Sequence, residues 1–155
     1  MARIDFSGIP EVLADLRRRQ EAAGPVAAAI LDAGAAAAVS SWRETITRLG
    51  MVKTGAMRDS ISAKAGKDEM SREITAKGKD EKGVRNGQKA FILHYGTSRI
   101  TASYWWTTAE QEAEPKVTAA MKRIWDTYNA TGSIPQASAG DVFVSTSGGR
   151  RSHKK

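Results

Sequence analysis

Few side chains in this sequence combine the types and spacing that catalysis or metal binding requires. The chain of 155 residues contains no cysteine and two histidines, His94 and His153. A thiol nucleophile and a cysteine-ligated zinc site are therefore excluded. With two histidines, a histidine-rich metal site is not expected. Glycine-rich phosphate loops and the Gly-x-Ser-x-Gly nucleophile motif are absent from the sequence. We expect no catalytic residue, no cofactor and no metal, and predict that the protein is not an enzyme.

Two aromatic segments indicate contacts rather than chemistry. His94 stands in an apolar run beside Tyr95, and a lone histidine in such a run is more often packed, or part of an interface, than a general base. Trp105 and Trp106 are adjacent. On a strand they would point to opposite faces, so that one of them would need a partner to cover it. In a helical turn both could be buried, and the sequence leaves this alternative open.

The charge balance favours anionic partners. The formal net charge is +7 and the pI is about 9.9, which suits nucleic acid or an acidic protein surface, or solubility alone. Cations at the end of the chain can displace counterions from phosphates, although no aromatic side chain stands among them to stack on bases. The residues expected to face DNA are Arg150, Arg151, Lys154 and Lys155.

The chain divides into a single predicted domain, residues 1–130, and a glycine- and serine-rich arm, residues 131–155. A solubilising tail is one interpretation of the arm. A β-prone island within it favours docking on a neighbouring subunit, because an extended segment can add a strand to another chain's sheet. This island consists of Val142, Phe143 and Val144.

Residues 1–50 predict a pair of helices. Ser7 is placed to cap the first, and the Gly24-Pro25 dipeptide is expected to separate it from the second. The second helix, residues 26–49, has alanines that permit close approach of a neighbouring backbone. Its apolar stripe consists of Val26, Ile30, Ala33, Ala37, Trp42, Ile46 and Leu49. No segment approaches the ~20 apolar residues of a membrane span, and no secretory signal or membrane contact is expected.

The middle of the chain predicts a small antiparallel sheet. Residues 60–65 and 71–77 have strand-like patterns on either side of a polar turn, and residues 90–95 form the most apolar strand candidate. The glycine-rich stretch 77–89 between them is expected to be a mobile loop. We expect two of its basic residues, Arg85 and Lys89, to meet neighbouring subunits, together with Trp105 and Trp106.

A last helix is predicted behind a Thr-x-x-Glu capping box at Thr107 and Glu110. Its apolar stripe runs at helical spacing through Ala109, Ala113, Val117, Met121, Ile124, Trp125 and Tyr128, with Pro115 inside the pattern. The predicted fold class is therefore α+β: a small antiparallel sheet packed by an N-terminal helix pair and a C-terminal amphipathic helix, with an extended C-terminal tail.

Two short segments resemble a known family. Lys53-Thr-Gly-Ala-Met-Arg-Asp-Ser-Ile61 is similar to the T-G-x-L-x-x-S-I segment of the gp-ten-like tail-component family of lambda-like and HK-type long-tailed bacteriophages. Ala90-Phe-Ile-Leu-His-Tyr-Gly-Thr-Ser98 resembles that family's Y-A-x-x-x-E-Y/F-G-T segment, with His94 where an acidic residue is usual. The residues that match the motifs are Thr54, Gly55, Ser60, Ile61, Tyr95, Gly96 and Thr97.

The resemblance implies a structural protein of the virion, assembled in the host cytoplasm. Its members complete or join the tail at the neck, as a ring of subunits, expected to be six, around the DNA channel. The implied partners are further copies of the chain, the head-side connector or stopper, and the tail terminator or tail tube. A tail terminator, a minor tail protein and a basic nucleic-acid-binding protein of another kind are the alternatives that the sequence leaves open.

Overall fold

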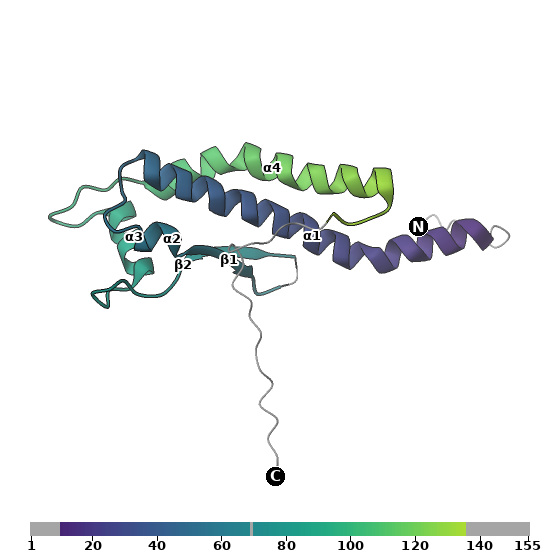
Figure 1. The fold of residues 1–155 in the computed structure, drawn as a ribbon, viewed down its shortest axis with the longest axis horizontal. Coiled ribbons are helices and arrows are strands. Elements are labelled where there is room, and N and C mark those ends of the chain that lie inside the picture. Colours follow the sequence, from purple (N-terminus) through teal and green to yellow (C-terminus); the bar gives the residue numbers. More distant parts are fainter. Residues whose placement is uncertain (1–9, 69, 136–155) are drawn as a thin grey trace, which may run out of the picture.

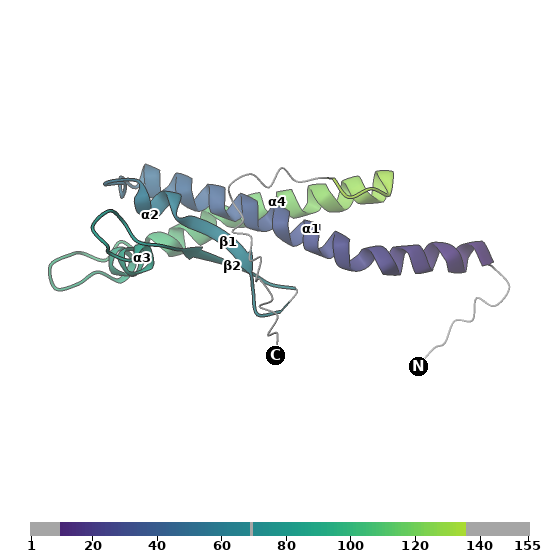
Figure 2. The same ribbon diagram turned by 60° about the horizontal axis from the view of Figure 1, so that its bottom comes forward.

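The computed structural model describes residues 10–68 and 70–135, with side chains from residue 18 onward. Two long helices lie side by side and antiparallel, a β-hairpin packs beneath them, and two short helices close one end of the molecule (Figures 1 and 2). The α+β class is confirmed. In chain order the elements are α1 (Pro10–Arg48), α2 (Ala56–Asp59), β1 (Ile61–Ala65), β2 (Arg72–Ala76), α3 (Asn86–Tyr95) and α4 (Trp105–Thr131).

The expected N-terminal helix pair is wrong, because α1 is one helix of 39 residues that runs through Gly24 and Pro25. Pro25 has no N–H for the carbonyl of Glu21, but both residues are exposed, so water can satisfy that carbonyl. Alanines on either side of the dipeptide favour helix and offset its cost. The predicted cap Ser7 lies outside the described residues.

The two long helices pack through small side chains. Ala33 and Ala35 of α1 and Ala113 of α4 are buried. At Gly34 the approach is so close that a Cβ atom there would lie 2.9 Å from Cγ of Met121. The residues of the two predicted stripes are buried or half-buried, except Leu49 and Trp125, which remain 40% and 49% exposed.

A polar cluster joins α1 to α4 beside these small residues. The buried Thr45 hydroxyl donates to Oε2 of Glu112 at 2.6 Å, and Arg48 pairs with the other oxygen of the same carboxylate. Lys116 reaches Glu44 at 2.6 Å. Both carboxylates thus accept bonds from the opposite helix, which fixes the register of the pair.

The β-hairpin forms where the sequence predicts it. β1 and β2 pair antiparallel in a register that sets Ala63 opposite Ile74. The hairpin packs against α1, whose Arg43 donates to the Ile61 carbonyl at 2.7 Å. A two-stranded sheet is marginal alone, so the hairpin depends on this helix.

The expected third strand, residues 90–95, is wrong, because this segment is the second half of helix α3. A short apolar run cannot be assigned to strand or helix by its periodicity alone. The buried residues of α3 are Asn86, Ala90 and His94, which recur every four residues as one helical face does. The last residues of the expected loop 77–89 thus form the first turn of this helix. The rest of the loop is held by Asp80, whose carboxylate accepts hydrogen bonds from the Lys82 and Val84 N–H groups.

Helix α4 begins at Trp105, before the predicted capping box. Tyr104 occupies the N-cap position without a side-chain capping bond, and Thr107 and Glu110 lie inside the helix. The start is set instead by burial of Trp105, whose side chain is 1% exposed.

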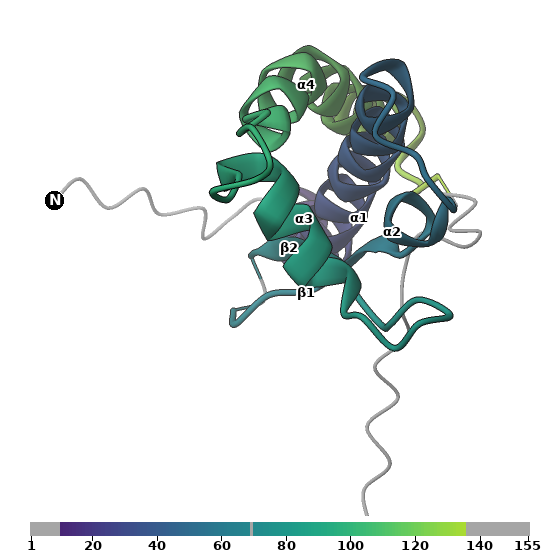
Figure 3. The ribbon, with the colours of Figure 1, turned by 90° about the vertical axis from the view of Figure 1, so that its left-hand side faces the viewer.

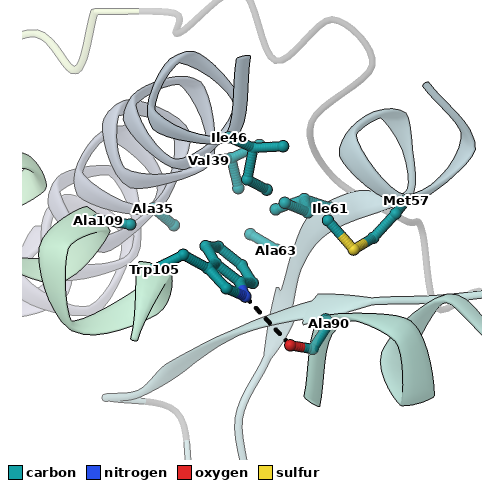
Figure 4. Close-up of a cluster of buried hydrophobic side chains, with 9 residues drawn as sticks. All are labelled: Ala35, Val39, Ile46, Met57, Ile61, Ala63, Ala90, Trp105 and Ala109. Atoms are coloured by element: carbon teal, nitrogen blue, oxygen red, sulfur yellow. Dashed lines mark hydrogen bonds between the residues drawn. The ribbon is translucent and has the colours of Figure 1, made fainter. Parts of the chain in front are cut away.

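The core gathers around this tryptophan (Figure 4). The Trp105 indole N–H donates to the Ala90 carbonyl at 3.1 Å, and its ring meets Trp42 edge-on at a centroid distance of 5.7 Å. Every helix and strand except β2 contributes a buried apolar side chain to the cluster, which consists of Ala35, Val39, Ile46, Met57, Ile61, Ala63, Ala90, Trp105 and Ala109.

By length and composition alone, residues 18–48 of α1 could cross a membrane, which contradicts the expectation that no segment is apolar enough. In the structure, however, the apolar face of this stretch packs against α4 and the hairpin. Its Asp32 forms an ion pair with Arg72 of β2 at 2.6 Å. A core helix passes the same compositional test, so this feature is weak evidence for a membrane.

The α1–α4 cluster predicts how stability depends on pH. The hydrogen bond from Arg48, followed by that from Thr45, lowers the pKa of Glu112 below its ordinary value of 4.5. A depressed carboxyl pKa stabilises the fold above the unfolded-state value and loses that contribution as pH falls. We expect Glu112→Gln to lower the melting temperature at pH 7 and to differ less from the wild type at pH 3.

The matched control is Glu114→Gln, which removes an exposed carboxylate of the same helix outside the cluster. Its melting temperature should follow the wild type at both pH values. Melting temperatures are measured by circular dichroism. If Glu112→Gln melted below the wild type by the same amount at pH 7 and at pH 3, the prediction would be contradicted.

Candidate assembly surface

Helix α3 and the loop that follows it, residues 96–104, form one end of the molecule. The loop projects beyond both long helices (Figure 1), and the end-on view shows α2 beside α3 with α1 and α4 behind them (Figure 3). Both sequence segments that carry the family resemblance lie at this end.

Four aromatic side chains gather here, and we call them the aromatic patch: Phe91, Tyr95, Tyr104 and Trp106. The last three contact His94, and Phe91 contacts Tyr95. Phe91, Tyr95 and Tyr104 are 56%, 53% and 59% exposed. Phe91 and Tyr95, one helical turn apart, contact each other at a centroid distance of 4.7 Å. Clustered exposed aromatics on a protein surface mark sites where another molecule binds.

His94 supports the patch from beneath. Its side chain is 4% exposed and stacks on Trp106 at a centroid distance of 4.2 Å. Its Nδ1 accepts a hydrogen bond from the Trp106 backbone N–H at 3.3 Å. A ring that is covered and accepts a backbone bond is a packing residue, as the sequence suggested.

The tryptophan pair is divided between core and surface, although it lies on a helix rather than a strand. Trp105 is buried in the protein's own core and so cannot meet a neighbouring subunit as expected. Trp106 is half-buried at the edge of the patch. Of the two predicted interface residues, Trp106 is therefore the one that a partner can reach.

The loop 96–104 holds its shape through Gly96 and Thr97. Gly96 has φ 76°, and a Cβ atom there would lie 2.5 Å from the Ile100 carbonyl oxygen. The Thr97 hydroxyl accepts from the backbone N–H groups of Arg99 and Ile100. The Gly-Thr pair thus ends a helix, and not the strand that the sequence predicts.

Tyr104 completes the loop in a costly conformation. It has φ 49° and is the one non-glycine residue with positive φ in the described chain. The left-handed region costs an L-residue about 1–2 kcal/mol. Its backbone N–H bonds to the His94 carbonyl at 3.1 Å, which ties the start of α4 to the end of α3. The conformation thereby places the exposed Tyr104 side chain beside His94 and the other members of the patch.

The Thr54-Gly55 segment stands across from α3. Gly55 has φ 79° and precedes α2, and the Thr54 hydroxyl accepts from the Ala56 N–H at 3.4 Å. Ser60 caps the other end of α2 by donating to the Met57 carbonyl at 2.7 Å. Ile61, which is 1% exposed, anchors the segment in the core. The motif residues of this segment therefore fix local structure.

An open groove of about 330 Å³ separates the two segments, and we call it the α2–α3 groove. Its apolar lining comes from the segment before α2, from α2 itself, from α3 and from the loop: Met51, Val52, Met57, Ile92, Leu93 and Ile100. Lys53, Arg58 and Lys89 also line it. The groove thus joins an apolar floor to basic side chains.

The two predicted basic interface residues differ in their availability. Arg85 is exposed where α3 begins. Lys89 is half-buried and forms an ion pair with Asp80. The hydrogen bond from the Lys89 side chain is the largest cause that lowers the pKa of Asp80, and the hydrogen bond from the Val84 N–H is the second. The arm residues Val142, Phe143 and Val144 and the basic residues Arg150, Arg151, Lys154 and Lys155 lie outside the described residues.

Metal chemistry receives no support from this end of the molecule. Among residues 18–68 and 70–135, no three histidine, aspartate or glutamate side chains gather as a metal site would require.

Phe91 and Tyr104 were not identified from the sequence as surface residues. For Phe91 the reason is that residues 90–95 were expected to form a strand. A helical projection of residues 86–95 would have placed Phe91 and Tyr95 on one face, away from Ala90 and His94.

We predict that Gly96→Ala costs about 2–4 kcal/mol of unfolding free energy, because it combines positive φ with a backbone collision. Gly83→Ala is the matched control: its φ is also 76°, but a Cβ atom there meets nothing within 4 Å. It should cost about 1 kcal/mol. Urea titrations measure the free energy of unfolding. If both variants lost the same amount, residue 96 would need glycine for its backbone conformation alone, and not for the close approach of the Ile100 carbonyl.

Comparison with known proteins gives this end of the molecule no precedent. No protein-family model, no curated protein and no solved structure matches the chain. The function proposed below therefore rests on the residues and the geometry described above.

Proposed function

We propose that this chain is a structural virion protein of a tailed bacteriophage. It would act in head–tail joining or tail completion at the neck, as one subunit of a ring, expected to hold six, around the DNA channel. The observation that carries the proposal is the aromatic patch. Three side chains that are each more than half exposed lie together at one end of the molecule, where a second copy can cover them.

The two ends of the molecule differ, as a contact within a ring requires. The patch lies at one end, while α1 alone forms the far end, because its first turns continue beyond the end of α4 (Figure 1). A contact between two different surfaces of identical subunits is heterologous, and it closes into a ring when the rotation permits. The segments that resemble the phage family also border this end, which supports the same assignment. A tail terminator or minor tail protein would use the same kind of contact.

A basic nucleic-acid-binding protein of another kind is the competing proposal, and it rests on the net charge of +7. The two proposals differ in their salt dependence. If phosphate contacts by four cations held the complex, the logarithm of DNA affinity would fall with the logarithm of salt with a slope of about −3.6. Apolar contacts between subunits respond weakly to salt. Self-association that survives high salt, without DNA affinity, separates the neck protein from its rival.

The proposal predicts that the double variant Phe91→Ser, Tyr95→Ser loses self-association. Aromatic side chains at the centre of interfaces contribute about 2 kcal/mol or more each, so each loss should weaken association at least about 30-fold. Native mass spectrometry and sedimentation velocity of the full chain measure the oligomer. Both residues are exposed, so the helical circular dichroism should be retained.

Met70→Ser is the matched control, since it removes a large apolar side chain that is 67% exposed in the hairpin turn, away from both ends of the molecule. It should leave the oligomer intact. A wild-type chain that remains monomeric at high concentration, and that is missing from phage particles, would remove the proposal. Equal loss of association in both variants would place the interface elsewhere.

A further inference from the structure

We propose that the α2–α3 groove receives the segment Asp141–Val144 of a neighbouring copy of this chain. The inference deepens the proposed function, on which it rests, by naming a second contact between subunits. The groove lies on α3 beside the aromatic patch but is lined by different residues of that helix, Ile92 and Leu93. An arm from one subunit could therefore occupy it while the patch contacts another surface.

The chemistry of the groove matches that of the segment. The volume of about 330 Å³ lies at the small end of the range for binding pockets, about 300–1,000 Å³. A site of this size suits one large apolar side chain and its neighbour. Two of its lining residues are Met51 and Met57, whose flexible side chains adapt to an inserted ring. Phe143, between two valines, is the one aromatic residue after Tyr128.

Charge complementarity gives the segment a direction. Asp141 precedes the three apolar residues and is the one acidic residue after Asp126. The cations beside the groove are Lys53, Arg58 and Lys89. Arg58 and Lys89 already pair with Asp59 and Asp80, whereas Lys53 is exposed. Asp141 is therefore expected to lie near Lys53.

The length of the arm favours a neighbouring groove over the chain's own. Helix α4 has 27 residues and is about 40 Å long. It begins beside α3 and ends far from it, alongside the first half of α1 (Figure 1). The stretch from Gly132 to Phe143 would span at most about 36–40 Å if fully straight, and a flexible chain of this length has a mean span of about 17–20 Å. To reach its own groove the arm would have to be taut, whereas a subunit packed alongside can present its groove within the ordinary span.

Disulfide trapping tests the inference directly, because the chain contains no cysteine. Full-length Val144→Cys and Ile92→Cys proteins are mixed and oxidised mildly, so that the Phe143 ring is kept. We expect a disulfide-linked heterodimer on non-reducing gels, formed at least tenfold faster than with Val144→Cys and Glu114→Cys, where the second thiol lies on the exposed face of α4. Val52→Cys replaces Ile92→Cys if that variant does not fold, as judged by circular dichroism.

A charge exchange tests the orientation of the arm. In the trapping pair, Asp141→Lys in the arm-bearing protein and Lys53→Glu in the groove-bearing protein should each slow the disulfide severalfold, and together they should restore the rate. No restoration would overturn the predicted contact between Asp141 and Lys53.

The outcomes separate this inference from the proposed function. Oligomers in native mass spectrometry without trapping above the Glu114→Cys control would overturn the groove as the docking site and leave the ring standing. Monomers without trapping would overturn both. A chain carrying both cysteines that closes the disulfide within itself would show that the arm occupies its own groove, against the argument from length.

Discussion

The contact on which the structure depends is that of the Trp105 indole with the elements around it. Its N–H group donates to the Ala90 carbonyl, and its ring fills the space left by alanines on α1, β1, α3 and α4. Because small residues surround the one large ring, the elements can approach it from several sides. The indole therefore fixes α3 against the start of α4, and with it the place of everything that α3 carries.

The aromatic patch is a consequence of that arrangement. His94 follows Ala90 by one turn, so it faces inward, stacks on Trp106 and accepts the backbone bond of that residue. Phe91 and Tyr95 then face outward. Tyr104 is held at positive φ by the same short connection between α3 and α4. The strained backbone of Tyr104 and the exposed aromatic side chains thus lie in one place. Strained conformations are found at binding sites, where the rest of the structure compensates for their free-energy cost.

Sequence patterns predicted the features that arise locally. The hairpin followed from two β-prone runs around a polar turn, and α4 from a long stripe at helical spacing. The continuity of α1 did not follow, because Gly24-Pro25 is a strong local signal for a break and its tolerance depends on exposure to water. Helix α3 did not follow either, because Ala90–Tyr95 is apolar throughout and its helical face is defined by packing against Trp105. The patch was missed for the same reason, while Gly55 and Gly96 were singled out because they match the family motifs.

The notch at Gly34 has a mechanical consequence. The Met121 side chain reaches the α1 backbone there because residue 34 has no side chain. The residues one turn away along α1, Ile30 and Ala38, do bear side chains. Sliding α4 along α1 by one helical turn, about 5.4 Å, would drive Met121 against one of them and pull Glu112 away from Thr45. These contacts prevent α1 and α4 from sliding past one another. A force that pulls along the molecule would therefore be opposed by the contacts along the whole helix pair.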